Sequence, residues 1–423
     1  MRTVGIIAEY NPFHTGHAYH IAQAKKISGA DYAMVIMSPD FVQRGTPAVF
    51  DKYTRTQMAL QCGADLVIEL PVCYASGSAE FFAEGAIALL NRIGVVDTLV
   101  FGAEHDDLAL FQATADLLLE EPEAYSKMLK AFLKEGFTYP KARSEALIRT
   151  LESNTFSCIQ NDSGNTQSYL SSFLSSPNNI LGIEYCKALK KTKSRIMPIP
   201  LLRFGSSYNS TSLDGVFCSA SALREGIQRE EDMEELLPFI PVSCRPLFLD
   251  SLKRTVFADD MLPFIVNKLL TEQSFSHILD ISLDLSERIQ NLRFPSIGKS
   301  FDELSESLKT KQVTKARINR ALVHLLLDIR TDAVDSFRQK GTVFYAKVLG
   351  FSKNAVSLLH AIKENSDLPF LTKPAKADSL LQGAGLNMWK QDLYASHLYR
   401  SVVSCKYHVP FRTEWETSPI ILP

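Results

Sequence analysis

The feature that most constrains the fold is an alternation of short apolar runs with helical patterns along the first hundred residues. The runs "TVGIIAEY", "YAMVIMS", "DLVIELP" and "TLVFGAE" are separated by "HAYHIAQAKK", "TRTQMALQCG" and "AEFFAEGAIALLNRIG". Apolar runs that alternate with helices indicate βαβ units and a parallel sheet. A further strand is predicted at "IMPIPLLRF", residues 196–204, after the helical pattern "NNILGIEYCKALKK".

The second part of the chain has a different pattern. From about residue 230 onward it is helical, with "RINRALVHLLLDI" as the clearest stretch and no convincing strand alternation. The sequence therefore predicts an α/β domain over residues 1–228 and a mostly helical region over residues 229–423. Residues 153–176 are rich in Ser and Asn, which predicts a surface insertion or a mobile loop.

Composition limits the class of protein. The 423 residues suffice for more than one domain, and the 46% hydrophobic fraction with a net charge of -2 indicates a globular protein without a general excess of positive charge. The seven cysteines are well separated and form no C-x-x-C, so neither a disulfide framework nor a zinc knuckle is expected. No signal-peptide pattern and no apolar stretch of about 18 residues occurs, so we expect a cytoplasmic protein without a membrane partner.

Three of the nine histidines lie in "EYNPFHTGHAYH", residues 9–20, between the first predicted strand and the first predicted helix. In an open parallel sheet, ligands bind beyond the carboxyl ends of the strands, where this turn presents the N–H groups of a helix N-terminus. Gly16 lets a phosphate approach closely. His14 and His17 share the first helical turn, so both can donate hydrogen bonds to phosphoryl oxygens, most strongly in the transition state. The pattern predicts catalytic roles for His14 and His17.

Two alternatives remain open for this pair. In the first, His14 caps the helix and His17 is an exposed surface residue. In the second, the pair binds a metal ion, which two histidines at this spacing rarely do without a nearby third ligand.

The H-x-G-H pattern resembles the signature of the nucleotidyltransferase superfamily, whose members attack the α-phosphorus of ATP and release pyrophosphate. A second phosphate-binding element of that superfamily, I-S-S-T-x-x-R, is similar to "CSASALR" at residues 218–224. By itself this stretch also fits an N-cap serine followed by a surface arginine. The two elements together imply a Rossmann-like nucleotidyltransferase domain in which Ser219, Ser221 and Arg224 bind phosphate.

Further stretches narrow the resemblance. In chain order, "GIIAEYNPFHTGH", "FVQRGTPAVFDKYTR", "GADLVIELP", "LVFGAE", "SPNNILGIEYCKAL" and "YAKVLGF" are similar to motifs of the bacterial tRNA(Met) cytidine acetate ligases. The resemblance implies that the chain activates acetate with ATP as acetyl-AMP. It further implies transfer of the acetyl group to N4 of the wobble cytidine of elongator tRNA(Met), which gives N4-acetylcytidine. The ATP-binding residues that it implies are Ile7, Ala8, Glu9, Tyr10, Asn11, Pro12, Phe13, His14, Thr15, Gly16, His17, Ala18, Tyr19, His20, Gly102, Asn179 and Arg203.

The residues offer what this chemistry requires. Acetate is ionised near pH 7, so its attack on phosphorus needs alignment and charge neutralisation but no general base. The donors and cations that the sequence supplies for this purpose are His14, His17, Arg44, Arg203 and Arg224. Mg²⁺ is expected to arrive with ATP, bound mainly by the nucleotide's own phosphates. The sequence identifies no protein ligand for it. Asp40 and Glu9 are candidates, although each fits equally a helix cap or an ion pair.

A candidate RNA surface lies in the helical region. "KTKQVTKARINR", residues 309–320, carries five basic residues and no acid. On the helix predicted there, Arg317, Arg320 and His324 share one face, while apolar residues at core spacing form another. We predict that Arg317 and Arg320 bind tRNA phosphates. An ion-paired, solvated helix face is an equal alternative.

Two other classes of function stay open. One is a small-molecule adenylyltransferase, which the long helical region disfavours because such enzymes need little beyond the α/β domain. The other is a nucleotide- or RNA-binding protein without turnover, which the presence of both phosphate elements disfavours.

Overall fold

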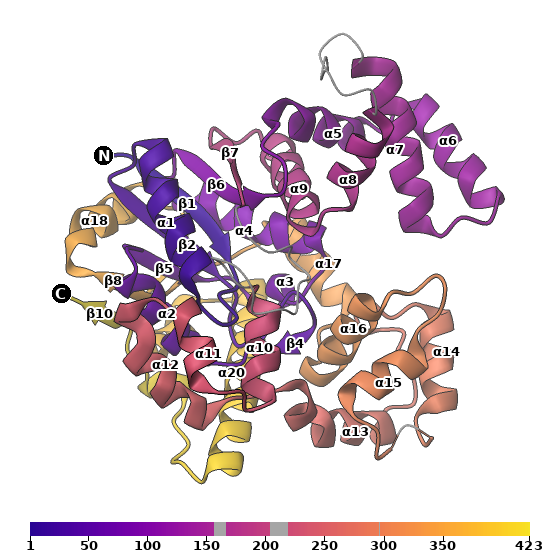
Figure 1. The fold of residues 1–423 in the computed structure, drawn as a ribbon. Coiled ribbons are helices and arrows are strands. Elements are labelled where there is room, and N and C mark those ends of the chain that lie inside the picture. The colour runs from indigo at the N-terminus through magenta and orange to yellow at the C-terminus, as the bar shows by residue number, and fades with distance from the viewer. Residues whose placement is uncertain (156–165, 204–218, 296) are drawn as a thin grey trace. The chain divides into compact units, whose positions relative to one another are not determined.

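The computed structural model describes residues 1–155, 166–203, 219–295 and 297–423. The chain forms two compact units. Met1–Thr98 and Gly205–Pro423 make up the first, called unit 1 below, and Leu99–Phe204 make up unit 2. Figure 1 shows the helices and strands of both. No helix within the described ranges combines the length and the apolar character that crossing a bilayer requires.

A mostly parallel sheet forms the centre of unit 1. Its strands follow the order β10-β8-β5-β2-β1, and β9 pairs with β8. β1, β2 and β5 run parallel, β8 is antiparallel to β5, and β10 is parallel to β8. The bounds are β1 (Thr3–Ala8), β2 (Tyr32–Met37), β5 (Leu66–Glu69), β8 (Ala346–Ser352), β9 (Phe370–Leu371) and β10 (Ile420–Leu422), with a separate hairpin of β3 (Phe41–Val42) and β4 (Thr46–Pro47).

The N-terminal strands of this sheet are buried along most of their length. Val4, Ile6, Val35 and Ile68 have no exposed surface. A parallel strand covered on both faces needs a continuous apolar run, not an alternation. This explains why the short apolar runs of the sequence identified these strands, and the α/β fold is confirmed.

The helices of unit 1 fall before and after unit 2 in the chain. Those before it are α1 (Thr15–Ser28), α2 (Lys52–Gln61), α3 (Val72–Ala75) and α4 (Ala79–Ile93). Those after it are α10 (Ala220–Gln228), α11 (Met233–Leu236), α12 (Arg245–Ser251), α13 (Leu262–Thr271), α14 (Leu283–Leu292), α15 (Phe301–Leu308), α16 (Lys315–Leu327), α17 (Thr331–Lys340), α18 (Val356–Asn365), α19 (Ala377–Leu380) and α20 (Gly383–Tyr407). Short 3₁₀ helices are η1 (Leu237–Phe239), η2 (Val242–Cys244), η3 (Leu252–Arg254), η4 (Ala258–Met261), η5 (Lys353–Ala355), η6 (Pro374–Lys376) and η7 (Glu414–Glu416).

The C-terminal region is mostly helical, as predicted, but it also supplies β8, β9 and β10. The sequence pattern missed these strands because β9 and β10 are very short and β8, "AKVLGFS", contains a charged residue, Lys347, that is buried. Through β8 and β10 the C-terminal region shares a sheet with β5. The two compact units meet at residues 98 and 99 and at residues 204 and 205. The division into a catalytic region before residue 228 and an RNA-binding region after it stays a prediction.

Unit 2 contains β6 (Thr98–Ala103) except for its first residue, and β7 (Met197–Leu202), its neighbour in the sheet order. Its described part also contains five helices. The helices are α5 (Leu108–Glu120), α6 (Glu123–Lys134), α7 (Tyr139–Thr155), α8 (Thr166–Ser175) and α9 (Pro177–Lys191). Within the segment 153–176, predicted as an insertion or loop, α8 buries Leu170 and Phe173 completely. Phe173 packs edge-on against Phe111 of α5 with ring centroids 4.8 Å apart. Residues 156–165 of that segment lie outside the described residues.

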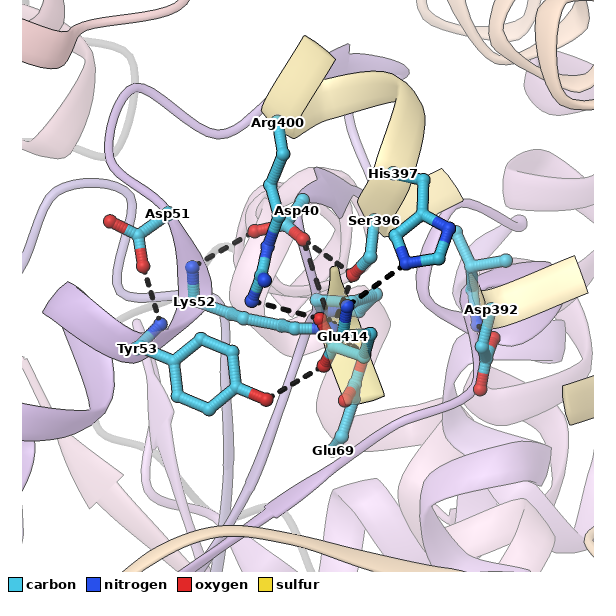
Figure 2. A network of polar contacts seen from close by, with 12 residues as sticks. Asp40, Asp51, Lys52, Tyr53, Glu69, Asp392, Ser396, His397, Arg400 and Glu414 are labelled. Atoms are coloured by element: carbon cyan, nitrogen blue, oxygen red, sulfur yellow. Dashed lines mark hydrogen bonds and ion pairs between the residues drawn. The ribbon is translucent and has the colours of Figure 1, made fainter. Parts of the chain in front are cut away.

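A buried ion network joins the N-terminal and C-terminal parts of unit 1 (Figure 2). Nζ of Lys52 lies 2.7 Å from a carboxylate oxygen of Glu69 and 3.0 Å from one of Glu414. Lys347 of β8 pairs with the same two carboxylates, at 2.6 Å from Glu69. Arg400 of α20 pairs with the second Glu414 oxygen at 2.9 Å. The network thus holds α2, β5, β8, α20 and η7 together.

Glu414 is the residue on which these contacts converge. Besides the ion pairs, it accepts a hydrogen bond from the Tyr53 hydroxyl at 2.7 Å. Burial raises the pKa of its carboxyl group, but Lys347, Lys52 and Arg400 outweigh this and hold the pKa well below its ordinary value. Glu414 is therefore an anion whose charge is needed to keep two buried ammonium groups in place.

Replacement of Glu414 by Ala should lower the free energy of unfolding by about 3–5 kcal/mol, because Lys52 and Lys347 lose a shared partner in the interior. Urea-induced unfolding at pH 7 measures this. The control is Glu364→Ala on the exposed face of α18, which should stay within about 0.5 kcal/mol of the parent.

The same pair of proteins gives a pH test. A carboxyl group whose pKa is lower in the folded than in the unfolded state stabilises the fold above its ordinary pKa of 4.5 and loses that contribution as the pH falls through the folded value. The difference in stability between the parent and Glu414→Ala should therefore shrink below pH 4.5. A difference that is constant from pH 7 to the acid-unfolding range would contradict the assignment of Glu414 as the network's anion.

Candidate active site

Two histidines cap the N-terminus of α1 at the end of the loop that follows β1, which we call the histidine loop (residues 9–17). His14 is the N-cap of α1, and its Nδ1 accepts a hydrogen bond from the Gly16 N–H at 3.0 Å. The Nδ1 of His17 accepts one from the His14 N–H at 3.3 Å. Each imidazole therefore satisfies one of the backbone donors that a helix N-terminus leaves without an intrahelical partner.

These contacts set the tautomer of both rings. A neutral imidazole that accepts at Nδ1 carries its proton on Nε2. His14 and His17 are thus both held as Nε2–H donors, with ring centroids 3.8 Å apart. The helix-capping alternative and the donor role are compatible, because capping engages Nδ1 of each ring, whereas the donor is the Nε2–H.

Two aromatic side chains pack against His17. Tyr10 and Phe13 are buried, and both rings contact His17, with centroids at 4.9 Å and 5.6 Å. Tyr10 itself has a left-handed backbone conformation, with φ of 52°.

The second sequence element meets this loop. Ser219 is the N-cap of α10, with its Oγ accepting from the Ala222 N–H at 3.1 Å, so the N-cap alternative holds for this residue. Arg224, by contrast, is more than a surface arginine: its Nη1 donates to the Asn11 carbonyl oxygen at 2.6 Å. Two motifs separated by some two hundred positions in the chain are thereby brought together.

Arg44 from the β3–β4 hairpin joins them. Its Nη1 and the Nη2 of Arg224 each donate to the Ser221 Oγ, both at 3.0 Å. Two guanidinium groups that share one uncharged hydroxyl concentrate positive charge next to the histidine loop. Forked N–H donors of this kind match the geometry of phosphate oxygens.

A fully buried arginine that the sequence analysis missed organises the loops around this site. Arg55 of α2 donates to the carbonyl oxygens of Phe50 at 2.9 Å, Glu9 at 2.6 Å and Ser38 at 3.0 Å, and also to that of Pro39. It thus ties the ends of β1 and β2 to each other. The available signal was a basic residue within the apolar pattern "TRTQMAL".

The two acids considered for a metal have other partners. Asp40 accepts from the Lys52 N–H at 2.9 Å and from the Ser396 hydroxyl at 2.9 Å. Burial raises the pKa of Asp40, against the opposing effect of nearby Lys52. Glu9 accepts from the Gln43 N–H at 2.7 Å. Within the part of the chain that the structure describes, no three potential metal ligands cluster.

Unit 2 carries the remaining predicted ATP residues. Asn179 is fully buried, and its Oδ1 accepts from the N–H of Glu104 at 2.9 Å. Arg203 pairs its backbone N–H with the Ala103 carbonyl at 2.9 Å, and its side chain lies beside Gly102, where an added Cβ would be 3.5 Å away. Asn179 thus orders the turn after β6, and Gly102 leaves space next to Arg203.

The predicted tRNA residues Arg317 and Arg320 converge on Asp280. Nε of Arg320 lies 3.0 Å from an Asp280 carboxylate oxygen, and Nε of Arg317 donates to the Asp280 carbonyl at 3.1 Å. His324, on the same helix face, is completely buried. This pairing agrees with the alternative of an ion-paired helix face. It agrees best for Arg320, because the Arg320 side chain is 13% exposed, whereas that of Arg317 is 40% exposed.

The same helix also contacts the hairpin that carries Arg44. Gly45 has φ of 74°, and a Cβ at this position would lie 2.2 Å from the backbone nitrogen of Arg320. Glycine is therefore required here both for the left-handed turn and for the close approach of α16.

Comparisons with known proteins agree with this geometry. The chain matches the family model described as HIGH Nucleotidyl Transferase over residues 1–411. It is 39% identical to the tRNA(Met) cytidine acetate ligase of Clostridium perfringens over 427 aligned residues that cover 100% of both chains. It is also 39% identical to the tRNA(Met) cytidine acetate ligase of a Thermoanaerobacter species, over 94% of this chain and 95% of the relative.

Solved structures are similar over the full length. TmcAL of Thermotoga maritima in its apo form I superposes with a TM-score of 0.90 at 30% identity, and covers 100% of both chains. The same protein bound with alpha-thio ATP superposes with a TM-score of 0.88.

The sheet and the histidine-capped loop at its edge define a HIGH-type nucleotidyltransferase. Within that class, the relatives named above are 30–39% identical to this chain over 94–100% of its length. The chain belongs to the family of tRNA(Met) cytidine acetate ligases.

The tautomers of His14 and His17 can be measured directly. Long-range ¹H–¹⁵N correlation spectra of the neutral imidazoles should show Nδ1 without a proton and Nε2 with one, because both Nδ1 atoms accept from backbone N–H groups. The exposed His360 of α18 should show the mixture of tautomers usual for a solvated ring. A protonated Nδ1 in either His14 or His17 would contradict the capping geometry.

Proposed function

We propose that this chain activates acetate with ATP and transfers the acetyl group to N4 of the wobble cytidine of elongator tRNA(Met). The observation that carries the proposal is the contact of Arg224 with the Asn11 carbonyl, because it unites the H-x-G-H loop and the serine–arginine element in one cationic site. The names of the family members and the alpha-thio ATP bound by the Thermotoga maritima relative support ATP as substrate.

In the first half-reaction, an acetate oxygen attacks the α-phosphorus, the bond to the bridging oxygen breaks, and pyrophosphate leaves. His14 and His17 donate their Nε2–H groups to phosphoryl oxygens as negative charge grows on them. Arg44 and Arg224, oriented by Ser221, neutralise the departing pyrophosphate. We assign Ser219, whose Oγ caps α10, to placing that helix N-terminus toward the phosphates.

The remaining residues to which we assign ATP binding, on the family resemblance, are the segment from Ile7 to His20 and Gly102, Asn179 and Arg203. Mg²⁺ would enter with the nucleotide and neutralise its phosphates. The residues described here suit a metal held mainly by ATP, because Asp40 and Glu9 are both engaged in hydrogen bonds to the protein.

In the second half-reaction, the exocyclic N4 of cytosine attacks the acetyl carbonyl, one N4 proton is lost, and AMP leaves. Since the lone pair of this amine is delocalised into the ring, the base must be held firmly against the acetyl-AMP. The substrate tRNA places the proposed reaction in the cytoplasm, where tRNA is modified and used.

Acetate-dependent exchange of labelled pyrophosphate into ATP tests the first half-reaction, and mass spectrometry of digested tRNA(Met) tests the second. We expect exchange of pyrophosphate into ATP when acetate is added without tRNA. We expect N4-acetylcytidine only when ATP, acetate and tRNA are all present. Pyrophosphate release driven by nicotinamide mononucleotide or phosphopantetheine would instead support a small-molecule adenylyltransferase. Binding of ATP and tRNA without turnover would support a non-catalytic protein.

Loss of either histidine donor should lower the exchange rate by roughly 10²–10³, or about 3–4 kcal/mol, with a much smaller change in ATP affinity. His14→Asn is the informative variant, because Asn keeps an N-cap acceptor but lacks the Nε2 donor; His17→Ala is its partner. His360→Ala, far along the chain on the exposed face of α18, is the control. Near-normal exchange in both variants would overturn the assigned role.

The tRNA role of Arg317 and Arg320 stays a prediction, and the two residues now serve as a matched pair. If Arg317 contacts a phosphate, Arg317→Ala should weaken tRNA binding and reduce the slope of log affinity against log salt by about one, without loss of pyrophosphate exchange. Arg320→Ala should chiefly lower the melting temperature, because it leaves Asp280 without its nearest cation. An unchanged salt slope in both variants would place the RNA surface elsewhere.

A further inference from the structure

Two cysteines from distant parts of the chain meet in unit 1. Cys62 is the C-cap of α2, and Cys244 ends the 3₁₀ helix η2. Their sulfur atoms lie 3.5 Å apart across a sequence separation of 182 residues. The Ser243 hydroxyl lies 3.8 Å from each sulfur. Because a disulfide has a sulfur–sulfur distance of about 2.0 Å, a small movement of the two side chains suffices to form the bond.

We propose that Cys62 and Cys244 are a redox-active pair that forms a reversible disulfide when the protein meets a peroxide. The two members differ in access. Cys62 is partly exposed, whereas Cys244 has no exposed surface. A dissolved oxidant therefore reaches Cys62, and Cys244 is placed to resolve the oxidised product. The proposal is independent of the proposed function.

The reaction balances with one molecule of hydrogen peroxide. The Cys62 thiolate attacks a peroxide oxygen, the O–O bond breaks, and the released hydroxide takes up the proton that Cys62 had lost and leaves as water. The product is a sulfenic acid on Cys62. The Cys244 sulfur then attacks the Cys62 sulfur, the S–O bond breaks, and the hydroxide leaves with the Cys244 proton as a second water. The two sulfurs lose two electrons, which reduce the peroxide.

The hydrogen bonds between the thiols favour this order of events. A hydrogen bond from Cys244 lowers the pKa of the Cys62 thiol; burial opposes this, and Ser243 adds a second lowering contact. The same thiol–thiol contact, together with burial, raises the pKa of Cys244. The Cys62 sulfur is thus the better nucleophile toward an oxidant, since the thiolate is the reactive form.

The bond would join α2 to the segment between α11 and α12 that contains η2. α2 also carries Lys52 of the buried network and Arg55 of the loop scaffold near its other end. A disulfide at Cys62 would fix the carboxyl end of this helix to η2. Disulfides of proteins in reducing compartments are usually transient and regulatory, and partial access to Cys62 makes the bond reversible by small thiols.

The pairing is tested by treating the purified full-length protein with hydrogen peroxide, blocking the remaining thiols with iodoacetamide, and digesting it without reduction. Mass spectrometry should detect a peptide that joins Cys62 to Cys244 and is two hydrogen atoms lighter than the sum of its parts. Dithiothreitol should remove it. Cys405→Ser, at an exposed cysteine, should leave the cross-link unchanged.

The variants test the order of the two steps. In Cys244→Ala, dimedone should trap a persistent sulfenic acid on Cys62, whereas in Cys62→Ser no adduct should form on Cys244. Peroxide at a concentration that fully oxidises Cys405 in the parent protein, yet gives no Cys62–Cys244 peptide, would overturn the proposal. So would a predominant disulfide between Cys62 and any of the other cysteines. Because the parent protein alone decides this question, a Cys244 variant that fails to fold leaves the test intact.

Discussion

The stability of unit 1 depends on a buried cluster of ion pairs in which every charged group needs its partners. Lys52 and Lys347 are each at most 1% exposed, and the carboxylates of Glu69 and Glu414, which both ammonium groups share, compensate that burial. The cost of leaving one ammonium unpaired exceeds the worth of most single apolar contacts. The sheet, α20 and the segment around Glu414 must therefore assemble together, although they come from opposite ends of the chain.

Asp40 links this cluster to the loops of the proposed site. Asp40 accepts from the Lys52 N–H and from Ser396 of α20, and it lies at the start of the hairpin that presents Arg44. Arg55 fixes the neighbouring carbonyl groups after β1 and β2. The groups to which we assign catalysis are few, and buried polar residues outside that proposed set hold the loops that carry them. Such a supporting layer is what preorganised donors require.

Local sequence patterns predicted a large part of the fold and several members of the site. The strands β1, β2 and β5 were recognisable because buried parallel strands need unbroken apolar runs, and β6 and β7 have apolar runs of their own. The pattern missed β8, since its Lys347 is tolerated only by partners far away in the chain. It missed α8 because a Ser-rich composition hid the spacing of Leu170 and Phe173, and it missed Arg55 because basic residues are ordinarily exposed.

The sequence by itself determined the properties that depend on near neighbours. The H-x-G-H spacing places two imidazoles on the first turn of a helix, and the family motifs along the chain identify the reaction class. The tautomer of those imidazoles is local as well, because both Nδ1 atoms accept from N–H groups within three residues along the chain. Only the tertiary structure decided the meeting of Arg44 with Arg224 at Ser221 and the pairing of Arg320 with Asp280. The physical reason is that a hydrogen bond or an ion pair across a fold depends on which residues packing brings within about 3 Å. No local pattern carries that information.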